Sequence, residues 1–161
     1  MRVNRIEELA RAAETYPLLA DLPPEHLPKL LEIAEERWFE ENEIIFPEGA
    51  RSERLFLIAS GRIALETMAG GQRIVIQTLG AGDTMGWSAL TETTTTHFQA
   101  RALTRVQTIA FDGVALRVAF KENHNLGFEI MKRLLALVTE RLDHTRMQLI
   151  DMYGKRAAKR S

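Results

Sequence analysis

Residues 86–98 bring together the side chains of this chain that could do chemistry: an indole, a serine hydroxyl, threonine hydroxyls and an imidazole. A serine nucleophile at a turn between a strand and a helix needs a glycine on both sides, in the pattern G-x-S-x-G. The string around Ser88 reads G-W-S-A-L, and no later order of acid and histidine supports a triad. We interpret Ser88 as the cap of a short helix and predict no catalytic residue and no enzymatic activity.

The histidines offer little to a metal ion. The four histidines are His26, His97, His124 and His144. None of them forms an H-x-H or H-x-x-x-H pair with another. Such pairs are the spacings at which two imidazoles reach one metal. The chain has no cysteine, which excludes disulfides, iron–sulfur clusters and thiol catalysis. We predict no metal site and no cofactor.

Composition limits the classes of function that this chain can have. With 161 residues and 45% hydrophobic residues, one globular domain spanning residues 1–161 is expected. The formal net charge of −1 provides no basic field that would draw the protein onto nucleic acid. No apolar run approaches the ~20 residues of a membrane span, and the first residues lack the apolar core of a signal peptide. We expect a cytoplasmic protein.

Several predicted elements must position residues 86–98. Along the chain the first of them are helices, expected over residues 1–37. Apolar residues at helical spacing predict one helix over residues 4–15. A second helix is predicted after Pro23, because prolines at the first turn and Glu25 mark a helix start. Leu27, Leu30 and Ala34 then form one apolar face.

From Trp38 the hydrophobic period changes to two, and Gly, Pro and Asn separate short β-rich runs. The pair Gly70-Gly71 supplies the positive φ angles of a tight hairpin. Short strands at this spacing indicate an antiparallel sandwich or roll. We therefore predict a mainly β fold, an antiparallel β-roll or jelly roll over residues 38–111 with flanking helices. Its strands are expected at residues 38–39, 43–46, 54–59, 62–67, 73–78, 84–85, 98–103 and 104–111.

After Asp112 the pattern is helical to about Tyr153, with Asp112 or Asn125 as candidate caps. The last helical segment carries two apolar stripes. Ile130, Leu134 and Leu137 form one, which can pack on the roll. The other steps by three and four residues as a heptad seam, through Phe128, Met131, Leu135, Val138, Leu142, Thr145, Leu149 and Met152. We predict a homodimer whose interface contains Met131, Leu135, Val138, Leu142, Thr145 and Leu149.

Gly154 is predicted to end this helix, which leaves residues 154–161 as a short basic tail. Four cations lie in it: Lys155, Arg156, Lys159 and Arg160. Without aromatic partners or a folded platform, they are typical of a solvated chain end.

The order of helices, β-roll and long helix, together with the motifs, resembles a known family. The string FPEGARSERLFLIASGRIALE is similar to the opening hairpins of the cyclic-nucleotide-binding domain, with Gly49 and Gly61 at the family's turn glycines. The segment from Gly80 to Leu90 resembles the approach to its phosphate-binding cassette, placed here at residues 82–97. Over residues 15–153 the chain looks most like the sensor half of the Crp/Fnr regulators, which implies a regulatory ligand sensor.

Two departures from that family shape the expected function. At the position of the family's ribose-binding Glu this chain has Trp87. At the position of the Arg that neutralises the cyclic phosphate it has Thr96. The residues after the long helix are too few for the family's helix-turn-helix, so we expect no direct DNA binding. A small ligand other than cyclic AMP or cyclic GMP is therefore predicted. Its binding residues are predicted as Gly86, Trp87, Ser88, Ala89, Leu90, Thr96, His97 and Phe98.

Alternatives to a ligand sensor remain open. Trp87 and Phe98 could fill the pocket, which would make the chain a protein-interaction or scaffold domain. It could also be a transcription regulator that acts through a separate DNA-binding partner. The parity of the strand after Phe98 predicts that Ala100 and Ala102 point into the roll and Arg101 points out. His97, at the start of that strand, stays a candidate for the pocket.

Overall fold

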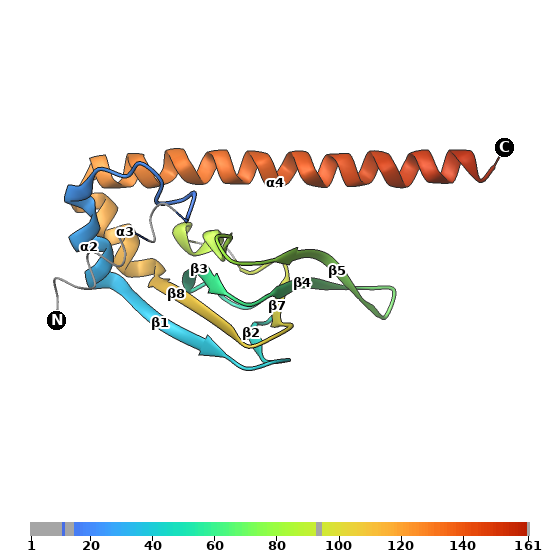
Figure 1. The fold of residues 1–161 in the computed structure, drawn as a ribbon, viewed down its shortest axis with the longest axis horizontal. Coiled ribbons are helices and arrows are strands. Elements are labelled where there is room, and N and C mark those ends of the chain that lie inside the picture. The colour runs from blue at the N-terminus through green and yellow to red at the C-terminus, as the bar shows by residue number, and fades with distance from the viewer. Residues whose placement is uncertain (1–10, 12–14, 93–94, 161) are drawn as a thin grey trace.

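The computed structural model describes residue 11, residues 15–92 and residues 95–160 of the chain (Figure 1). Short helices precede two β-sheets, and two further helices follow them. The helix predicted over residues 4–15 falls largely outside the described residues. Within the described part, the mainly β fold with flanking helices that the sequence predicted is confirmed.

The N-terminal helical region ends earlier than predicted. A short 3-10 helix, η1 (Pro24–His26), leads into α2 (Leu27–Ile33), and strand β1 (Ala34–Phe39) follows at once. The predicted start of β structure at Trp38 is therefore wrong. Residues 34–37 are Ala, Glu, Glu and Arg, which favour helix intrinsically. They form a strand because they pair with β8 (Val106–Asp112) from Ala34 opposite Phe111 onward.

The described strands form two four-stranded antiparallel sheets. One has the order β1-β8-β3-β6 and the other β2-β7-β4-β5. The remaining strands are β2 (Ile44–Phe46), β3 (Arg54–Ser60), β4 (Ile63–Ala69), β5 (Gln72–Leu79), β6 (Thr84–Met85) and β7 (Gln99–Ala102). Apolar side chains from both sheets form one buried cluster: Phe39, Phe56, Ile58, Ile63, Leu65, Leu79, Met85, Ala100, Ala102, Val106 and Ala110. The predicted β-roll is thus confirmed.

Glycine is required at the hairpin between β4 and β5 and at the turn before Trp87. Gly70 and Gly71 have φ angles of 58° and 77° and join β4 to β5, as the hairpin prediction required. Gly86 has a φ of 76°, and the place of a Cβ atom there is occupied by the carbonyl oxygen of Arg54. The chain can therefore enter the segment at Trp87 only through a glycine.

Two helices follow the sheets, α3 (Gly113–Glu122) and α4 (His124–Ala158). Asp112 caps α3 as predicted, because its carboxylate accepts a hydrogen bond from Ala115 N at 2.8 Å. The cap of α4 is Asn123, whose side chain accepts from Leu126 N at 3.1 Å, and not Asn125. The predicted end of the helix at Gly154 is wrong, since α4 continues to Ala158. Gly154 lies inside the helix, so most of the predicted basic tail is helical.

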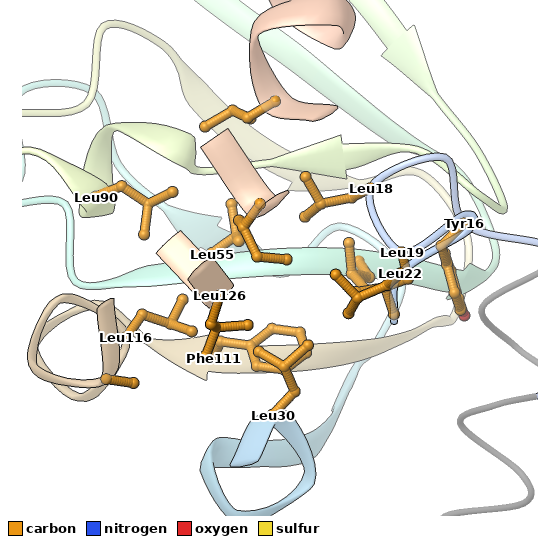
Figure 2. Close-up of a cluster of buried hydrophobic side chains, with 14 of the residues drawn as sticks. Tyr16, Leu18, Leu19, Leu22, Leu30, Leu55, Leu90, Phe111, Leu116 and Leu126 are labelled. Atoms are coloured by element: carbon orange, nitrogen blue, oxygen red, sulfur yellow. The ribbon is translucent and has the colours of Figure 1, made fainter. Parts of the chain in front are cut away.

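A second apolar cluster joins α4 to the roll. Figure 2 shows Leu126 of α4 close to Phe111 of β8, with Leu30 of α2 below them. Leu126, Ile130 and Leu134 are 0%, 2% and 8% exposed, and Leu137 packs against the same cluster. The predicted stripe of Ile130, Leu134 and Leu137 therefore packs on the roll. This contact holds α4 against the segment that follows Gly86.

Candidate functional site

A cavity of about 180 Å³ lies between the roll, the segment from Gly86 to Ser88 and α4. Its wall draws on elements far apart in sequence, including β2, β4, β5 and α4. The lining residues are Phe46, Leu65, Ile76, Gln77, Met85, Gly86, Trp87, Ser88, Thr96, His97, Phe98, Arg141 and Thr145. The wall is mostly apolar, and the single fully ionised side chain among these residues is Arg141.

Six of the predicted ligand-binding residues line this cavity, namely Gly86, Trp87, Ser88, Thr96, His97 and Phe98. The other two do not. Ala89 is 0% exposed and Leu90 is 7% exposed, and Leu90 packs in the cluster beneath α4. The 3-10 helix η2 (Trp87–Leu90) turns one side to the cavity and the other to the core.

Trp87 forms one side of the cavity. Its ring is half-buried and stacks under the guanidinium of Arg141, whose Cζ lies 4.1 Å from the ring centroid. A cation over an indole face is attracted by the ring quadrupole, most strongly when water is partly excluded. Because about 180 Å³ stays open beside Trp87, the alternative in which Trp87 and Phe98 fill the pocket completely does not describe this structure.

Arg141 is the charged lining residue that the sequence analysis missed. Its Nη2 donates a hydrogen bond to the carbonyl oxygen of Thr84 at 2.9 Å. Burial lowers the pKa of Arg141 from its ordinary value, and the charge of Asp83 acts in the opposite direction. A signal was present: in the stripe Ile130, Leu134 and Leu137, the next position at helical spacing is Arg141. An arginine that continues an apolar stripe points to a polar contact on the roll side.

Thr145 stands one turn after Arg141 and also lines the cavity. The sequence analysis placed it in the dimer seam. Its hydroxyl donates to the carbonyl oxygen of Arg141 at 3.0 Å, and its side chain lies where the roll-facing stripe and the seam meet. One position of α4 thus lines the cavity and also belongs to the predicted seam.

Thr96 fastens the turn that follows β2. Its Oγ1 donates to the carbonyl oxygen of Pro47 at 2.5 Å and accepts from Ala50 N at 3.1 Å. Its backbone N–H donates to Ala50 O, and its carbonyl accepts from Gly49 N, both at 2.8 Å. An arginine at position 96 would break the side-chain contacts. Thr96 is therefore a structural wall of the cavity.

The prediction that Ser88 caps the short helix is wrong for η2. The N-cap position is Gly86, without a side-chain hydrogen bond. The hydroxyl of Ser88 instead donates to Oγ of Ser52 at 2.8 Å, which ties η2 to the loop before β3.

Arg101 points out of the roll, as strand parity predicted, and Ala100 and Ala102 are 0% exposed. Its Nε donates to Oε1 of Glu66 at 2.7 Å. Arg73 Nε lies 3.2 Å from the other oxygen of Glu66, and Gln99 Nε2 donates to it at 3.3 Å. Because Glu66 is 1% exposed, Arg101 serves to pair a buried carboxylate on the outer face of the sheet.

The positive charge of Arg141 lets the cavity attract an anion. In the described ranges, no group of three or more His, Cys, Asp or Glu side chains could hold a metal ion. The lining residues include no carboxylate. Among the helices so described, none is long and apolar enough to cross a membrane.

Comparisons with known proteins identify the family to which this fold belongs. The family of the cyclic nucleotide-binding domain matches residues 36–123. A Geobacter metallireducens protein described as a cyclic nucleotide-binding protein is 27% identical, with a TM-score of 0.74 over 83% of this chain and 96% of its own. A cyclic nucleotide-binding domain from Methylobacillus flagellatus has a TM-score of 0.80 at 19% identity, over 92% and 84% of the two chains.

The catabolite activator protein of Thermus thermophilus is 25% identical, with a TM-score of 0.70. The match covers 85% of this chain and 63% of that protein. Because the family match spans more than half of the chain, the chain belongs to the cyclic nucleotide-binding domain family. Domains of this family are typically regulatory, non-catalytic modules, and one structural relative is the N-terminal domain of a transcriptional regulator from Streptomyces coelicolor.

Proposed function

We propose that this chain is a non-catalytic ligand sensor whose cavity binds a small molecule other than cyclic AMP or cyclic GMP. The observation that carries the proposal is the composition of the cavity wall. Trp87 stands where the resemblance expects the ribose-binding Glu, and Thr96 stands where it expects the phosphate-binding Arg. Trp87 offers an indole donor and no acceptor, and Thr96 has no charge and already bonds to Pro47 and Ala50.

The volume of the cavity supports the same proposal. Sites for drug-sized ligands usually enclose about 300–1,000 Å³, whereas this cavity encloses about 180 Å³. A ligand smaller than a nucleotide fits this space without movement of the wall.

Titration calorimetry tests the proposal directly. With cyclic AMP or cyclic GMP added to the purified chain, no binding in the low-micromolar range is expected, because both charged anchors of the cassette are missing. The loss of two charge-assisted contacts reduces affinity by orders of magnitude. A micromolar dissociation constant for either nucleotide would refute the proposal.

We further propose that the sensor is a homodimer through α4. The seam residues Met131, Leu135, Leu142 and Leu149 are 40%, 68%, 47% and 54% exposed in the single chain. Apolar residues at heptad spacing bury such a surface against a second helix. Val138 differs from the other seam residues, because it also packs against the cluster beneath α4.

A further inference from the structure

The Asp83 carboxylate acts on the charge of Arg141 without forming an ion pair with it. In the part of the chain that the structure describes, no acidic side chain forms an ion pair with it, and its contacts are the Thr84 carbonyl and the Trp87 ring. Arg101 and Arg133 are also partly buried, and each pairs with a carboxylate, Glu66 and Glu129 respectively. A guanidinium has five N–H donors in a planar fork. Arg141 therefore presents unused donors at the edge of the cavity.

The surroundings of Arg141 strengthen its attraction for an anion. Partial exclusion of water strengthens an electrostatic contact. The Trp87 ring below the guanidinium and the hydrogen bond to Thr84 hold its plane, so little side-chain freedom is lost on binding. Gln77, His97 and Thr145 line the same cavity as Arg141.

The rest of the wall defines the body of the ligand. Phe46, Leu65, Met85 and Phe98 are apolar or aromatic lining residues, which favour a flat, apolar group. One cation matches one negative charge, and a phosphate dianion would leave charge unpaired in a largely apolar cavity. A carboxylate accepts the guanidinium fork through two parallel hydrogen bonds.

We propose that Arg141 is the anion anchor of this cavity and that the ligand is a compact carboxylic acid with an aromatic or apolar body. This inference rests on the proposed function, that the cavity binds a small ligand. The charge that the cassette lacks is thereby supplied from α4, the helix that carries the proposed dimer seam.

Calorimetric titration with benzoate and phenylacetate tests the proposal, with benzamide as the neutral counterpart and inorganic phosphate as the alternative anion. Binding of at least one carboxylate is expected, at least tenfold more tightly than benzamide or phosphate. Arg141→Gln should weaken that binding about ten- to hundredfold, and Arg141→Lys should weaken it less. Circular dichroism and thermal melting confirm that each variant is folded.

Arg105→Gln is the matched control. Arg105 also stacks on a tryptophan, with its Cζ 4.6 Å from the Trp38 ring, but it lies outside the cavity and is exposed. Its loss should leave carboxylate binding unchanged. Failure of both carboxylates to bind at 10 mM or equal binding of benzamide would overturn the proposal, as would unchanged binding by folded Arg141→Gln. Tight binding of cyclic AMP would instead refute the proposed function.

Discussion

The two halves of α4 have similar heptad patterns and opposite environments. In the first half, Leu126, Ile130 and Leu134 lie in the core beside β8. In the second half, every residue from Leu142 to Arg160 is exposed, and the helix extends past the roll (Figure 1). Arg141 stands at the boundary between them. The difference teaches that the period of a helix identifies its apolar faces, while the neighbouring elements decide which face is covered within the chain.

Removing a side chain from the buried half should have the largest effect on folding. Leu126→Ala removes a side chain that is 0% exposed and should lower the free energy of unfolding by about 3 kcal/mol. Urea unfolding monitored by circular dichroism measures this. Met147→Ala, in the exposed half and off the seam, is the control and should change stability by less than about 0.5 kcal/mol. Equal losses would mean that the two halves are packed alike.

Charges placed in the exposed half should separate the proposed dimer without unfolding the chain. Leu142→Glu with Leu149→Glu puts carboxylates into the seam, and the dimer dissociation constant should rise about 30-fold or more. Val138 is a poor site for this test, because its burial against the core would confuse dissociation with unfolding. Light scattering over a range of concentrations gives the mass.

Met147→Glu adds one charge outside the seam and should leave the dimer intact. A wild-type chain that stays monomeric at high micromolar concentration would contradict the proposed dimer.

A double-mutant cycle can measure the coupling energy between Arg141, at the boundary of the two halves, and Trp87. Combining Arg141→Gln with Trp87→Leu should give a coupling energy in urea unfolding of about 1 kcal/mol, because their stacked pair is partly desolvated. The same cycle with Arg105→Gln and Trp38→Leu should give about 0.5 kcal/mol, since that pair is exposed. Equal couplings would show that the cavity adds nothing to the contact.

The smallest expected effect is at the end of the exposed half. Gly154→Ala should raise helicity and stabilise the chain by a few tenths of a kcal/mol, less than the ~1 kcal/mol of a mid-helix position, because helix ends fray. Far-ultraviolet circular dichroism measures the change. A loss of helicity would show that Gly154 ends the helix in solution.

Much of the fold could be predicted from the sequence because the roll requires alternating apolar residues along its strands. The runs at β3, β4 and β8 were located for that reason, and Gly70-Gly71 defined the hairpin. The strand at Ala34 was missed because its side chains favour helix locally, and only pairing with β8 makes it extended. Local propensity yields to such tertiary contacts.

The candidate site was only half predictable. Its cassette wall follows from the string at Gly86, because a recognised motif keeps its residues close in sequence. Arg141 reaches Thr84 across 57 residues of chain, and a contact of that kind depends on how α4 docks. The role of Thr96 was hidden for a similar reason, since its hydroxyl bonds to a turn 46 to 49 residues earlier.

Because α4 is continuous past Arg141, a rotation of the helix at that residue would displace its whole exposed half. From Arg141 to Ala158 the helix extends about 25 Å at 1.5 Å per residue. A rotation of about 5° at Arg141, when an anion draws the guanidinium toward the cavity, would displace the far end by about 2 Å. Lys155 and Arg156 lie near that end, so such a rotation would move a cluster of positive charge that the ligand never touches.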